Sequence, residues 1–516
     1  MKRCEYDVVI VGSGAGGGTV AQTLAPLCAE GLRIAVLEQG PRLRDDEFTC
    51  REIEMASVLY EDGGGFLTSD GSMTLAMGRG YGGSTIVYTG TSIIAPERVI
   101  RHWDIPGLDH AEVGRRSRRF MQENNVHYLD DTRINENNRL FVQGCERLGF
   151  RVEQFPVNVK GCKGSSFCNL GCPNQAKMGT NRVQLPRAEA AGVEVITRCE
   201  VLRLGERSVR ARVHEIEPGG KGLPSPWEPG DYIVGAKIVV LAAGAVGSPT
   251  LLMRSNLTAE LPRLGRGFTC HPALILVAEH ERPITNFVGH PKSYYLDEFV
   301  ESDGFVLETC MYFPFTTAKA LSGFGPDHAE LMQAFPRLQM ILVLAVDHID
   351  PHNRVTIDAE GRSVVHYRFT PEVRRGLARG TLTSARIFFA AGARRVHLPL
   401  SRQPILPARE AHRLGSVVEE GRVRPGSVTV SAAHLQGGCA MGRGTADSVT
   451  DSRGRVHGLP WLYVADASLF PDSVEINPYL TIMALAERVA EAIRAELSSE
   501  GAPQPRDRSN VEAAGR

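Results

Sequence analysis

The stretch YDVVIVGSGAGGGTVAQTLA, from Tyr6 to Ala25, decides the fold. Its apolar run at residues 7–11 predicts a buried parallel strand, glycines follow in the pattern G-x-G-x-x-G, and small and apolar residues then predict a helix. The first two glycines permit a tight turn whose N–H groups approach a pyrophosphate, and the third lets the helix pack against the strand. We therefore expect a Rossmann-like dinucleotide site. The residues predicted to form it are Gly12, Gly14, Ala15 and Gly17.

An acidic residue follows this turn at the distance that a dinucleotide site requires. Glu38 ends the next apolar run, RIAVLE, about twenty residues beyond the last glycine of the pattern. A carboxylate at that place binds ribose hydroxyls. A plain glycine-rich turn would leave Glu38 without a role, so the acid strengthens the dinucleotide interpretation.

Two later segments repeat the order of strand, turn and helix. KIVVLAAGAVGSPTLL, residues 237–252, is one, and the chain closes with LYVADASLFPDSVEINPYLTIMALAERVAEAI. Asp466 comes just after the strand expected at residues 462–465, at the sheet edge where ligands bind. It is predicted to bind a ribityl chain or support a phosphate loop, with a simple turn residue as the alternative. Asn477 as N-cap and Pro478 as first helical residue would direct a positive helix end at the site.

Composition restricts the class of protein. The chain has 516 residues, 42% apolar and 23% charged, with a formal net charge of −1, so it can bury a large core and offers no basic surface for nucleic acid. Its 11 cysteines in a long chain indicate reduced thiols. No secretory signal is evident, and the longest apolar stretch, residues 238–247, is too short to span a membrane. We therefore expect a cytoplasmic protein without a transmembrane segment.

Three cysteines in GCKGSSFCNLGCPNQAKMGT raise the question of a metal site. Cys162, Cys168 and Cys172 have the spacing C-x5-C-x3-C, which matches neither a zinc ribbon nor the usual iron–sulfur run. We therefore predict no metal. A disulfide between Cys168 and Cys172 is the alternative, and the expected reducing compartment disfavours it.

A histidine surrounded by small residues is the candidate for chemistry. His434 lies in SAAHLQGGCAMG, residues 431–442, with Gly437 and Gly438 close behind it. A lone histidine in such a run is most often a turn or core residue, yet imidazole is also the side chain that titrates near neutral pH. This window alone leaves both interpretations open.

Together, these motifs resemble the glucose-methanol-choline (GMC) family of FAD-dependent oxidoreductases. The resemblance is carried by the glycine pattern with Glu38, GRGYGGSTIVYTG at 78–90, AAGAVGSP at 242–249, HLQGGC around His434 and the terminal NPYLTIMALAER. It is nearest to the cholesterol oxidase and long-chain alcohol oxidase branches. The further FAD contacts that the resemblance implies are Gly83, Ser84, Val201, Ala243, Asp466, Ala467, Asn477 and Pro478.

The resemblance assigns roles at the catalytic position. His434 would accept the proton of a substrate hydroxyl, with a pKa near the working pH, while Asn477 hydrogen-bonds the same oxygen and hydride passes to flavin N5. Gly437 and Gly438 would allow close approach of the backbone. The residues 78–90 contain no histidine, so FAD is expected to be non-covalent. Relatives carry an Asn near residues 86–88, where this chain has Ile, Val and Tyr, so the local flavin contact is expected to differ.

The expected reaction is oxidation of a primary or secondary alcohol to a carbonyl, with oxygen or another carrier as acceptor. Ten Phe or Tyr residues lie between Phe287 and Phe335, which favours an apolar substrate: a steroid, terpenoid, aromatic or long-chain alcohol. These aromatic residues could equally form the core of a second sheet. The alternatives for function are a lyase or decarboxylase of the same fold, a sugar-type alcohol oxidoreductase and, more weakly, a non-enzymatic flavoprotein.

The expected fold class is α/β: a discontinuous Rossmann-like FAD-binding domain with an inserted α+β substrate-binding domain. The FAD-binding domain is assigned to residues 1–100, 182–282 and 426–497, and the substrate domain to 101–181 and 283–425. Residues 498–516 are predicted to be a disordered tail.

Overall fold

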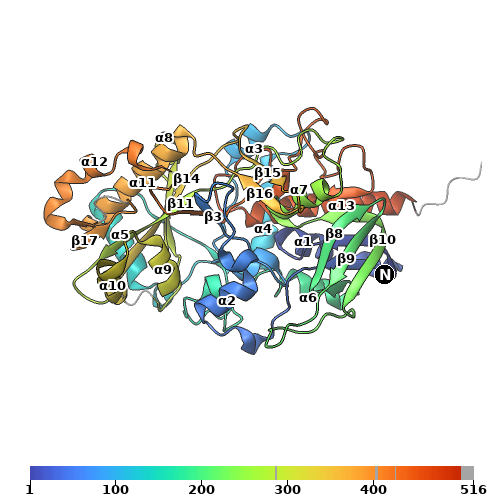
Figure 1. Cartoon of the computed structure of the whole chain (residues 1–516), viewed down its shortest axis with the longest axis horizontal. Helices are drawn as coiled ribbons and strands as arrows, with labels where there is room; N and C mark the ends of the chain where they lie inside the picture. Colours follow the sequence, from blue (N-terminus) through green and yellow to red (C-terminus); the bar gives the residue numbers. More distant parts are fainter. Residues whose placement is uncertain (285–286, 401–404, 425, 501–516) are drawn as a thin grey trace, which may run out of the picture.

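A computed structural model describes residues 1–284, 287–400, 405–424 and 426–500 of the chain. Two large sheets lie along the long axis of the molecule, with β8–β10 at one end and β11, β14 and β17 toward the other (Figure 1). The predicted α/β fold class is confirmed. The helix α13 continues to Glu500, and the remainder of the predicted tail lies outside the described residues.

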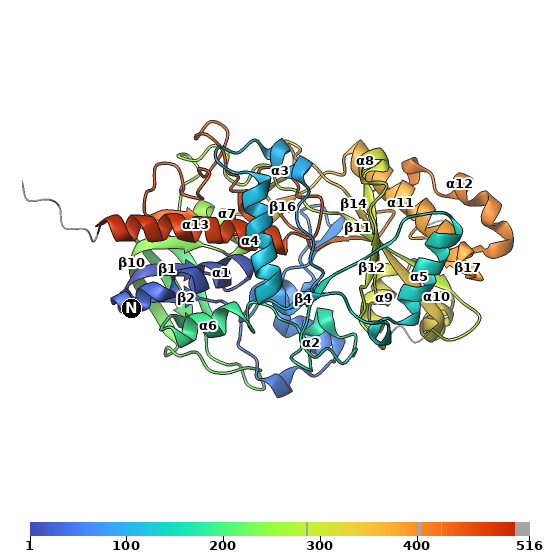
Figure 2. The ribbon, with the colours of Figure 1, turned by 180° about the vertical axis from the view of Figure 1, so that it is seen from behind.

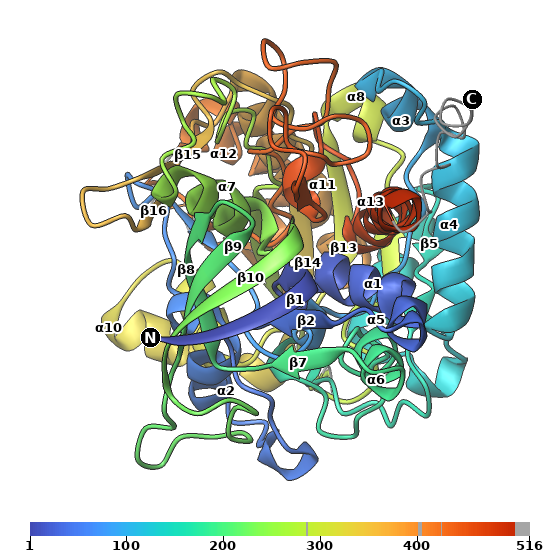
Figure 3. The same cartoon turned by 90° about the vertical axis from the view of Figure 1, so that its right-hand side faces the viewer.

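The first sheet is built on the strand that precedes the glycine turn. Val8, Val9 and Ile10 are fully buried in it, because a parallel strand at the centre of a sheet is covered on both faces. Figure 3 shows β1, β2 and β7 side by side with α1 and α6 next to them. The strands, in spatial order, are β7 (Glu194–Ile196), β2 (Ile34–Leu37), β1 (Lys2–Val11), β10 (Gly230–Leu241), β9 (Ser208–Val213) and β8 (Cys199–Gly205).

The strand β10 joins two kinds of pairing. It runs parallel to β1 from Tyr232 to Leu241. On its other edge, its first half pairs antiparallel with β9 and its last three residues pair parallel with β20 (Leu462–Val464). The carboxyl ends of β1, β2, β10 and β20 therefore meet at one edge of the sheet, where Rossmann-like folds bind ligands.

The second sheet is mostly antiparallel. Its strands, in spatial order, are β18 (Ile405–Pro407), β17 (Arg395–His397), β11 (Ala273–Glu279), β14 (Leu338–Ala345), β13 (Phe305–Thr309), β12 (Tyr294–Leu296) and β5 (Glu153–Gln154). β19 (Val430–Ala432) pairs with β11 and with β3 (Met73–Leu75). Thus β3, β11 and β19, from segments assigned to the FAD-binding domain, pair in the second sheet; the division into domains stays a prediction.

Helices cover both sheets, and two small two-stranded sheets complete the fold. α13 lies against α1 and α4 (Figure 2). The small sheets are β15 (Arg354–Ile357) with β16 (Ser363–His366), and β4 (Val126–His127) with β6 (Val157–Asn158), each pair antiparallel. The helices are α1 (Ala15–Leu24), α2 (Glu52–Leu59), α3 (Glu97–Trp103), α4 (His110–Glu123), α5 (Glu136–Arg147), α6 (Gln184–Ala190), α7 (Gly244–Arg254), α8 (Val300–Asp303), α9 (Pro314–Ala320), α10 (Gly325–Gln333), α11 (Pro371–Ala390), α12 (Leu414–Val417) and α13 (Tyr479–Glu500).

Among the described residues, no helix has the length and apolar character that crossing a bilayer requires.

Candidate active site

The glycine turn between β1 and α1 has the close backbone packing that its sequence predicts. Gly12 has a φ of +100°, and a Cβ there would lie 2.4 Å from the carbonyl oxygen of Ala242. A Cβ on Gly17 would lie 1.9 Å from the carbonyl oxygen of Gly12, so the third glycine lets the helix sit against the strand. No side chain caps the N-terminus of α1, whose N-cap is Gly14 and whose first residue is Ala15. Its first N–H groups can therefore meet an anion.

Glu38 is buried at the carboxyl end of β2, and its carboxylate holds the turn. One oxygen accepts from the amide N–H of Ser13 at 3.0 Å and from its hydroxyl at 2.6 Å, and the other accepts from Gly40 N–H at 2.8 Å. Burial raises the pKa of this carboxyl. Because each carboxylate oxygen has two lone pairs, Oε1 can still accept a hydrogen bond from a ribose hydroxyl.

The segment at residues 78–90 folds onto the glycine turn. Gly83 begins the short 3-10 turn η4 (Gly83–Ile86) at a φ of +52°, and a Cβ on it would lie 2.7 Å from Gly14 Cα. Ser84 is exposed and accepts a hydrogen bond from Gly78 N–H at 2.9 Å. Two glycine-containing segments that are distant in the sequence therefore face each other, and a side chain at position 83 would clash with Gly14.

Asp466 ties together two of the predicted cofactor segments. It accepts from Gly244 N–H at 2.8 Å, next to Ala243 at the start of α7, and from the Ser248 hydroxyl at 2.5 Å. Its other oxygen accepts from Ser468 N–H at 2.8 Å and caps η10 (Ala467–Leu469). These contacts join the start of α7 to η10, and the predicted role at a phosphate loop or a ribityl chain stays a prediction. Val201 is buried within β8.

These residues fit a dinucleotide cofactor. The uncapped start of α1, the glycine contact between residues 14 and 83, and a buried acid after β2 lie together at the carboxyl edge of the first sheet.

The structure brings His434 and Asn477 together. The amide Nδ2 of Asn477 lies 3.3 Å from His434 Nε2, and the histidine is half-buried. Asn477 and Pro478 directly precede α13, which begins at Tyr479, one residue later than predicted. The amide nitrogen of Asn477 serves this contact and a second one with Glu308 at 3.3 Å, where we had expected a helix cap. A ring nitrogen and an amide nitrogen therefore lie close enough for one small polar group to contact both.

The pKa of His434 differs from the sequence expectation. Burial, with the charge of Lys292 as the second cause, lowers this pKa to about 3, below the working-pH value that we expected. The imidazole is therefore unprotonated at neutral pH.

Sequence reasoning missed a buried ion pair beside this site. Lys292 donates to Glu308 Oε2, and both residues are more than nine-tenths buried. Glu308 lies on β13, and its other oxygen accepts from Asn477. A charged residue within the apolar run FVLETC was the available signal, because a buried charge requires a partner. The strand pairing that brings it to Asn477 left no local pattern.

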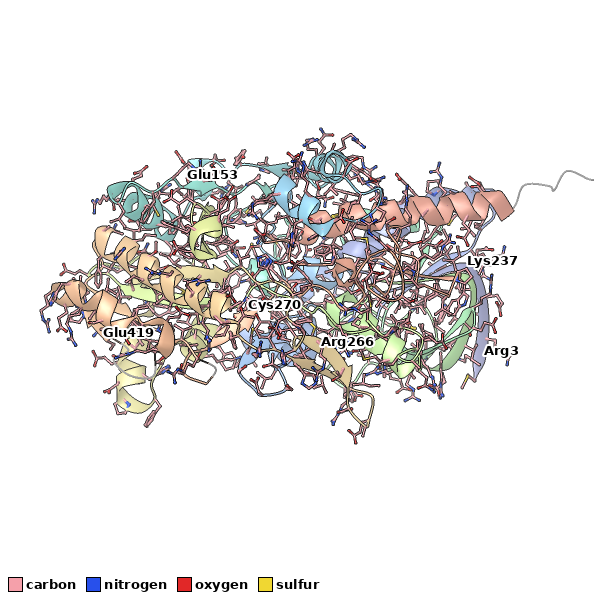
Figure 4. The ribbon with its side chains drawn as sticks, turned by 90° about the horizontal axis from the view of Figure 1, so that it is seen from above. Arg3, Glu153, Lys237, Arg266, Cys270 and Glu419 are labelled. Atoms are coloured by element: carbon pink, nitrogen blue, oxygen red, sulfur yellow. The ribbon has the colours of Figure 1, made fainter. Side chains whose placement is uncertain are left out.

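Sequence reasoning also missed His271, whose Nδ1 lies 2.9 Å from His434 Nδ1. Thr269 and Gln436 exchange backbone hydrogen bonds of 3.0 and 2.9 Å in antiparallel register, so residues 271 and 434 lie opposite each other. Cys270, the neighbour of His271, lies near the middle of the molecule, far from Arg3 and Lys237 at one end and Glu419 at the other (Figure 4). The site is therefore central, between the two sheets.

The three cysteines of residues 161–180 are free thiols, as are all 11 in the chain. Burial raises the pKa of Cys168 to about 12. Nearby, the buried Lys177 donates to the carbonyls of Tyr88 at 2.7 Å and Cys168 at 2.6 Å, and to that of Ile86. The segment thus supports the loop at 78–90. Among the described residues, no group of three or more His, Cys, Asp or Glu side chains is placed to hold a metal ion.

The aromatic residues between 287 and 335 are divided between core and surface. Phe305 is buried in the second sheet, whereas Phe324 and Phe315 are exposed. Phe313 stacks on Phe167 with ring centroids 4.8 Å apart, in an apolar cluster that includes Ile86 and Val87. Phe305 therefore belongs to the core of the second sheet, and a substrate pocket lined by aromatic residues of this stretch stays a prediction.

Comparison with known proteins shows the family of the chain. Two family models, both described as GMC oxidoreductase, match residues 56–273 and 350–486. An uncharacterized GMC-type oxidoreductase of Mycobacterium tuberculosis is 34% identical over 492 residues, covering 94% of this chain and 75% of the relative. A long-chain-alcohol oxidase of Arabidopsis thaliana is 27% identical over 537 residues, covering 95% and 67%.

Solved structures share the fold. A pyridoxine 4-oxidase from Mesorbium loti superposes with a TM-score of 0.69 at 18% identity, covering 95% of this chain and 99% of that one. A formate oxidase of Aspergillus oryzae, described with respect to FAD modification, gives 0.66 at 14% identity, covering 97% and 100%. The matched models span more than half of the sequence and the mycobacterial relative covers nearly all of it, so this chain belongs to the GMC oxidoreductase family and is an oxidoreductase.

Proposed function

We propose that this protein oxidises a primary or secondary alcohol to the carbonyl compound, with non-covalently bound FAD as cofactor and His434 as general base. The observation that carries the proposal is the pair formed by His434 Nε2 and Asn477 Nδ2, 3.3 Å apart. One hydroxyl oxygen can meet both atoms: its proton would face the ring nitrogen, and a lone pair would face the amide N–H.

FAD, when bound, supplies the hydride acceptor. The glycine turn, Glu38 and the loop at 78–90 would hold it. Its proposed non-covalent attachment is supported by the absence of histidine from residues 78–90.

His434 is the proposed acceptor of the substrate hydroxyl proton. A low pKa keeps the imidazole unprotonated and able to accept a proton at neutral pH. It also makes the ring a weak base, which suffices because a carbinol hydroxyl becomes far more acidic as hydride leaves its carbon. Asn477, held by Glu308, orients the oxygen during this transfer.

The substrate class is proposed to be an apolar alcohol, with oxygen or another carrier as electron acceptor. The apolar cluster of Phe167, Phe313, Ile86 and Val87 adjoins the loop at 78–90 and supports this choice. The relative from Arabidopsis thaliana, named a long-chain-alcohol oxidase, agrees with it. A lyase or decarboxylase is not favoured, since the named relatives are oxidases. The cytoplasmic location stays a prediction.

An anaerobic mixing experiment tests this function. The purified flavoprotein is mixed with a panel of long-chain, aromatic, terpenoid and steroid alcohols and with sugars, and flavin absorbance is followed. Bleaching by at least one apolar alcohol, with the matching aldehyde or ketone as product, is the expected result. A flavin that no alcohol reduces would refute the proposal, and reduction by sugars alone would refute the substrate class.

A further inference from the structure

A second imidazole lies behind His434, on the side away from Asn477. His271 is 3% exposed, and its ring stands perpendicular to that of His434, with an interplanar angle of 87° and centroids 5.0 Å apart. We propose that His271 is a positioning residue, which accepts the hydrogen of His434 Nδ1 and so fixes the tautomer in which Nε2 is the basic atom. This inference rests on the proposed function.

The first step of the argument concerns the nitrogen that faces the substrate. Glu308 is paired with Lys292, and its carboxylate oxygens accept hydrogen bonds, so the Asn477 group that faces it at 3.3 Å must be the NH₂. The second hydrogen of that NH₂ is directed to His434 Nε2, also at 3.3 Å. His434 Nε2 must therefore carry a lone pair, not a hydrogen.

The second step follows from the neutral state of both rings. A neutral imidazole has one hydrogen, so His434 carries it on Nδ1, and His271 Nδ1 must accept it across 2.9 Å. The hydrogen of His271 then lies on Nε2, which is 3.0 Å from the hydroxyl oxygen of Ser473. Ser473 also accepts from Glu475 N–H at 3.2 Å, so its oxygen is an acceptor in place.

The alternative places the hydrogen of His434 on Nε2 and that of His271 on Nδ1, and it agrees less well with the contacts. It would have His271 Nε2 accept from Gln436 Nε2 at 3.5 Å, the longer contact of that amide, whose other hydrogen goes to the carbonyl of His434 at 3.1 Å. It would also place a hydrogen on His434 Nε2 against the Asn477 amide. Backbone N–H of Val474 donates to Gln436 Oε1 at 2.8 Å, which fixes the orientation of that amide.

Burial is the main reason why His271 stays neutral. Burial, followed by His434, lowers the pKa of His271, with Glu308 acting in the opposite direction and His348 in the same direction. A neutral ring can accept at one nitrogen and donate at the other, which is what the arrangement requires.

Two variants of His271 distinguish the effect of its hydrogen-bond acceptor from the effect of its bulk. His271→Asn keeps an acceptor oxygen at the place of Nδ1, whereas His271→Leu removes it. We expect His271→Leu to lower the rate of anaerobic flavin reduction on the order of 10²-fold, with KM and FAD content unchanged, since a lost hydrogen bond to the far nitrogen releases the ring and its tautomer. His271→Asn should restore the rate to within about fivefold of the parent.

Two outcomes would overturn the proposal. If His271→Leu reduces its flavin at the parent rate, His271 does not position the base. If His271→Asn is as slow as His271→Leu, an acceptor alone is insufficient, and the ring must exchange protons instead.

A spectroscopic readout is independent of turnover. In ¹⁵N-histidine-labelled holoenzyme at pH 7, the ring signals of His434, assigned as those absent from His434→Asn, should show a protonated Nδ1 and an unprotonated Nε2. The reverse pattern would overturn the inference. Failure of the proposed function would look different, because His434→Ala would then keep the parent rate while the tautomer of His434 is still measurable.

Discussion

The buried pair of Lys292 and Glu308 permits a quantitative prediction. Lys292 is 8% exposed and Glu308 3% exposed, so replacement of the lysine leaves a buried carboxylate without its counter-charge. Breaking a buried ion pair in this way costs about 3–5 kcal/mol of the free energy of unfolding. We expect Lys292→Met, which keeps the aliphatic length, to be destabilised by that amount. The variant should also raise the pKa of His434, because Lys292 is the second cause of its low value after burial.

Urea unfolding at pH 7, followed by flavin and tryptophan fluorescence, measures the loss. The matched control is the double variant Lys292→Met/Glu308→Leu, which removes both charges and should recover most of the stability, since an apolar pair of similar volume needs no counter-charge. A Lys292→Met protein as stable as the parent would refute the reasoning. A double variant less stable than Lys292→Met would also refute it, because the penalty would then not come from an uncompensated carboxylate.

Three further predictions follow from the cofactor site, the buried histidines and the cysteines. The protein should release unmodified FAD on denaturation, and Glu38→Ala should weaken FAD retention by about 1–3 kcal/mol, as measured by equilibrium dialysis; a covalent flavin or unchanged retention would contradict this. Burial lowers the pKa of His290 and His397 to about 4 in the folded protein. Below pH ~6.5 the unfolded chain therefore binds protons that the folded protein does not. The free energy of unfolding, measured with urea, should fall between pH 6.5 and 4 by up to about 3 kcal/mol for each histidine. His397→Leu should reduce that fall, and an identical pH dependence would argue against the assignment. Metal analysis of protein made without chelators should find no stoichiometric iron or zinc, and one metal per chain that is lost on Cys168→Ser would disprove it.

The parts of the fold that depend on local sequence were predictable. The strand and helix on either side of the glycine turn follow from residues 7–25 alone, because apolar patterning and glycine spacing are local. Gly83 was predicted from the resemblance as an FAD contact, and the structure shows that it packs against Gly14.

The missing parts depend on pairing between distant strands. His271 meets His434 because the segments around Thr269 and Gln436 pair in antiparallel register, and Glu308 reaches Asn477 because β13 lies in the second sheet. Nothing near these residues in the sequence fixes such a register. For the same reason, the segments of β11 and β19 were assigned to the FAD-binding domain, although these strands pair in the second sheet. The prediction of a pKa near the working pH for His434 was wrong, because its burial and the nearby charge of Lys292 also arise only in the folded protein.

The most direct test of the central claim is the rate of anaerobic flavin reduction by His434→Ala, measured by stopped flow with one good alcohol substrate. The account predicts a protein that keeps its FAD and its fold but reduces its flavin on the order of 10²–10⁴-fold more slowly than the parent, the range for loss of a general base. Asn477→Ala should be slowed by less, because it removes one orienting contact and leaves the base in place. Reduction of His434→Ala at the parent rate would contradict the account.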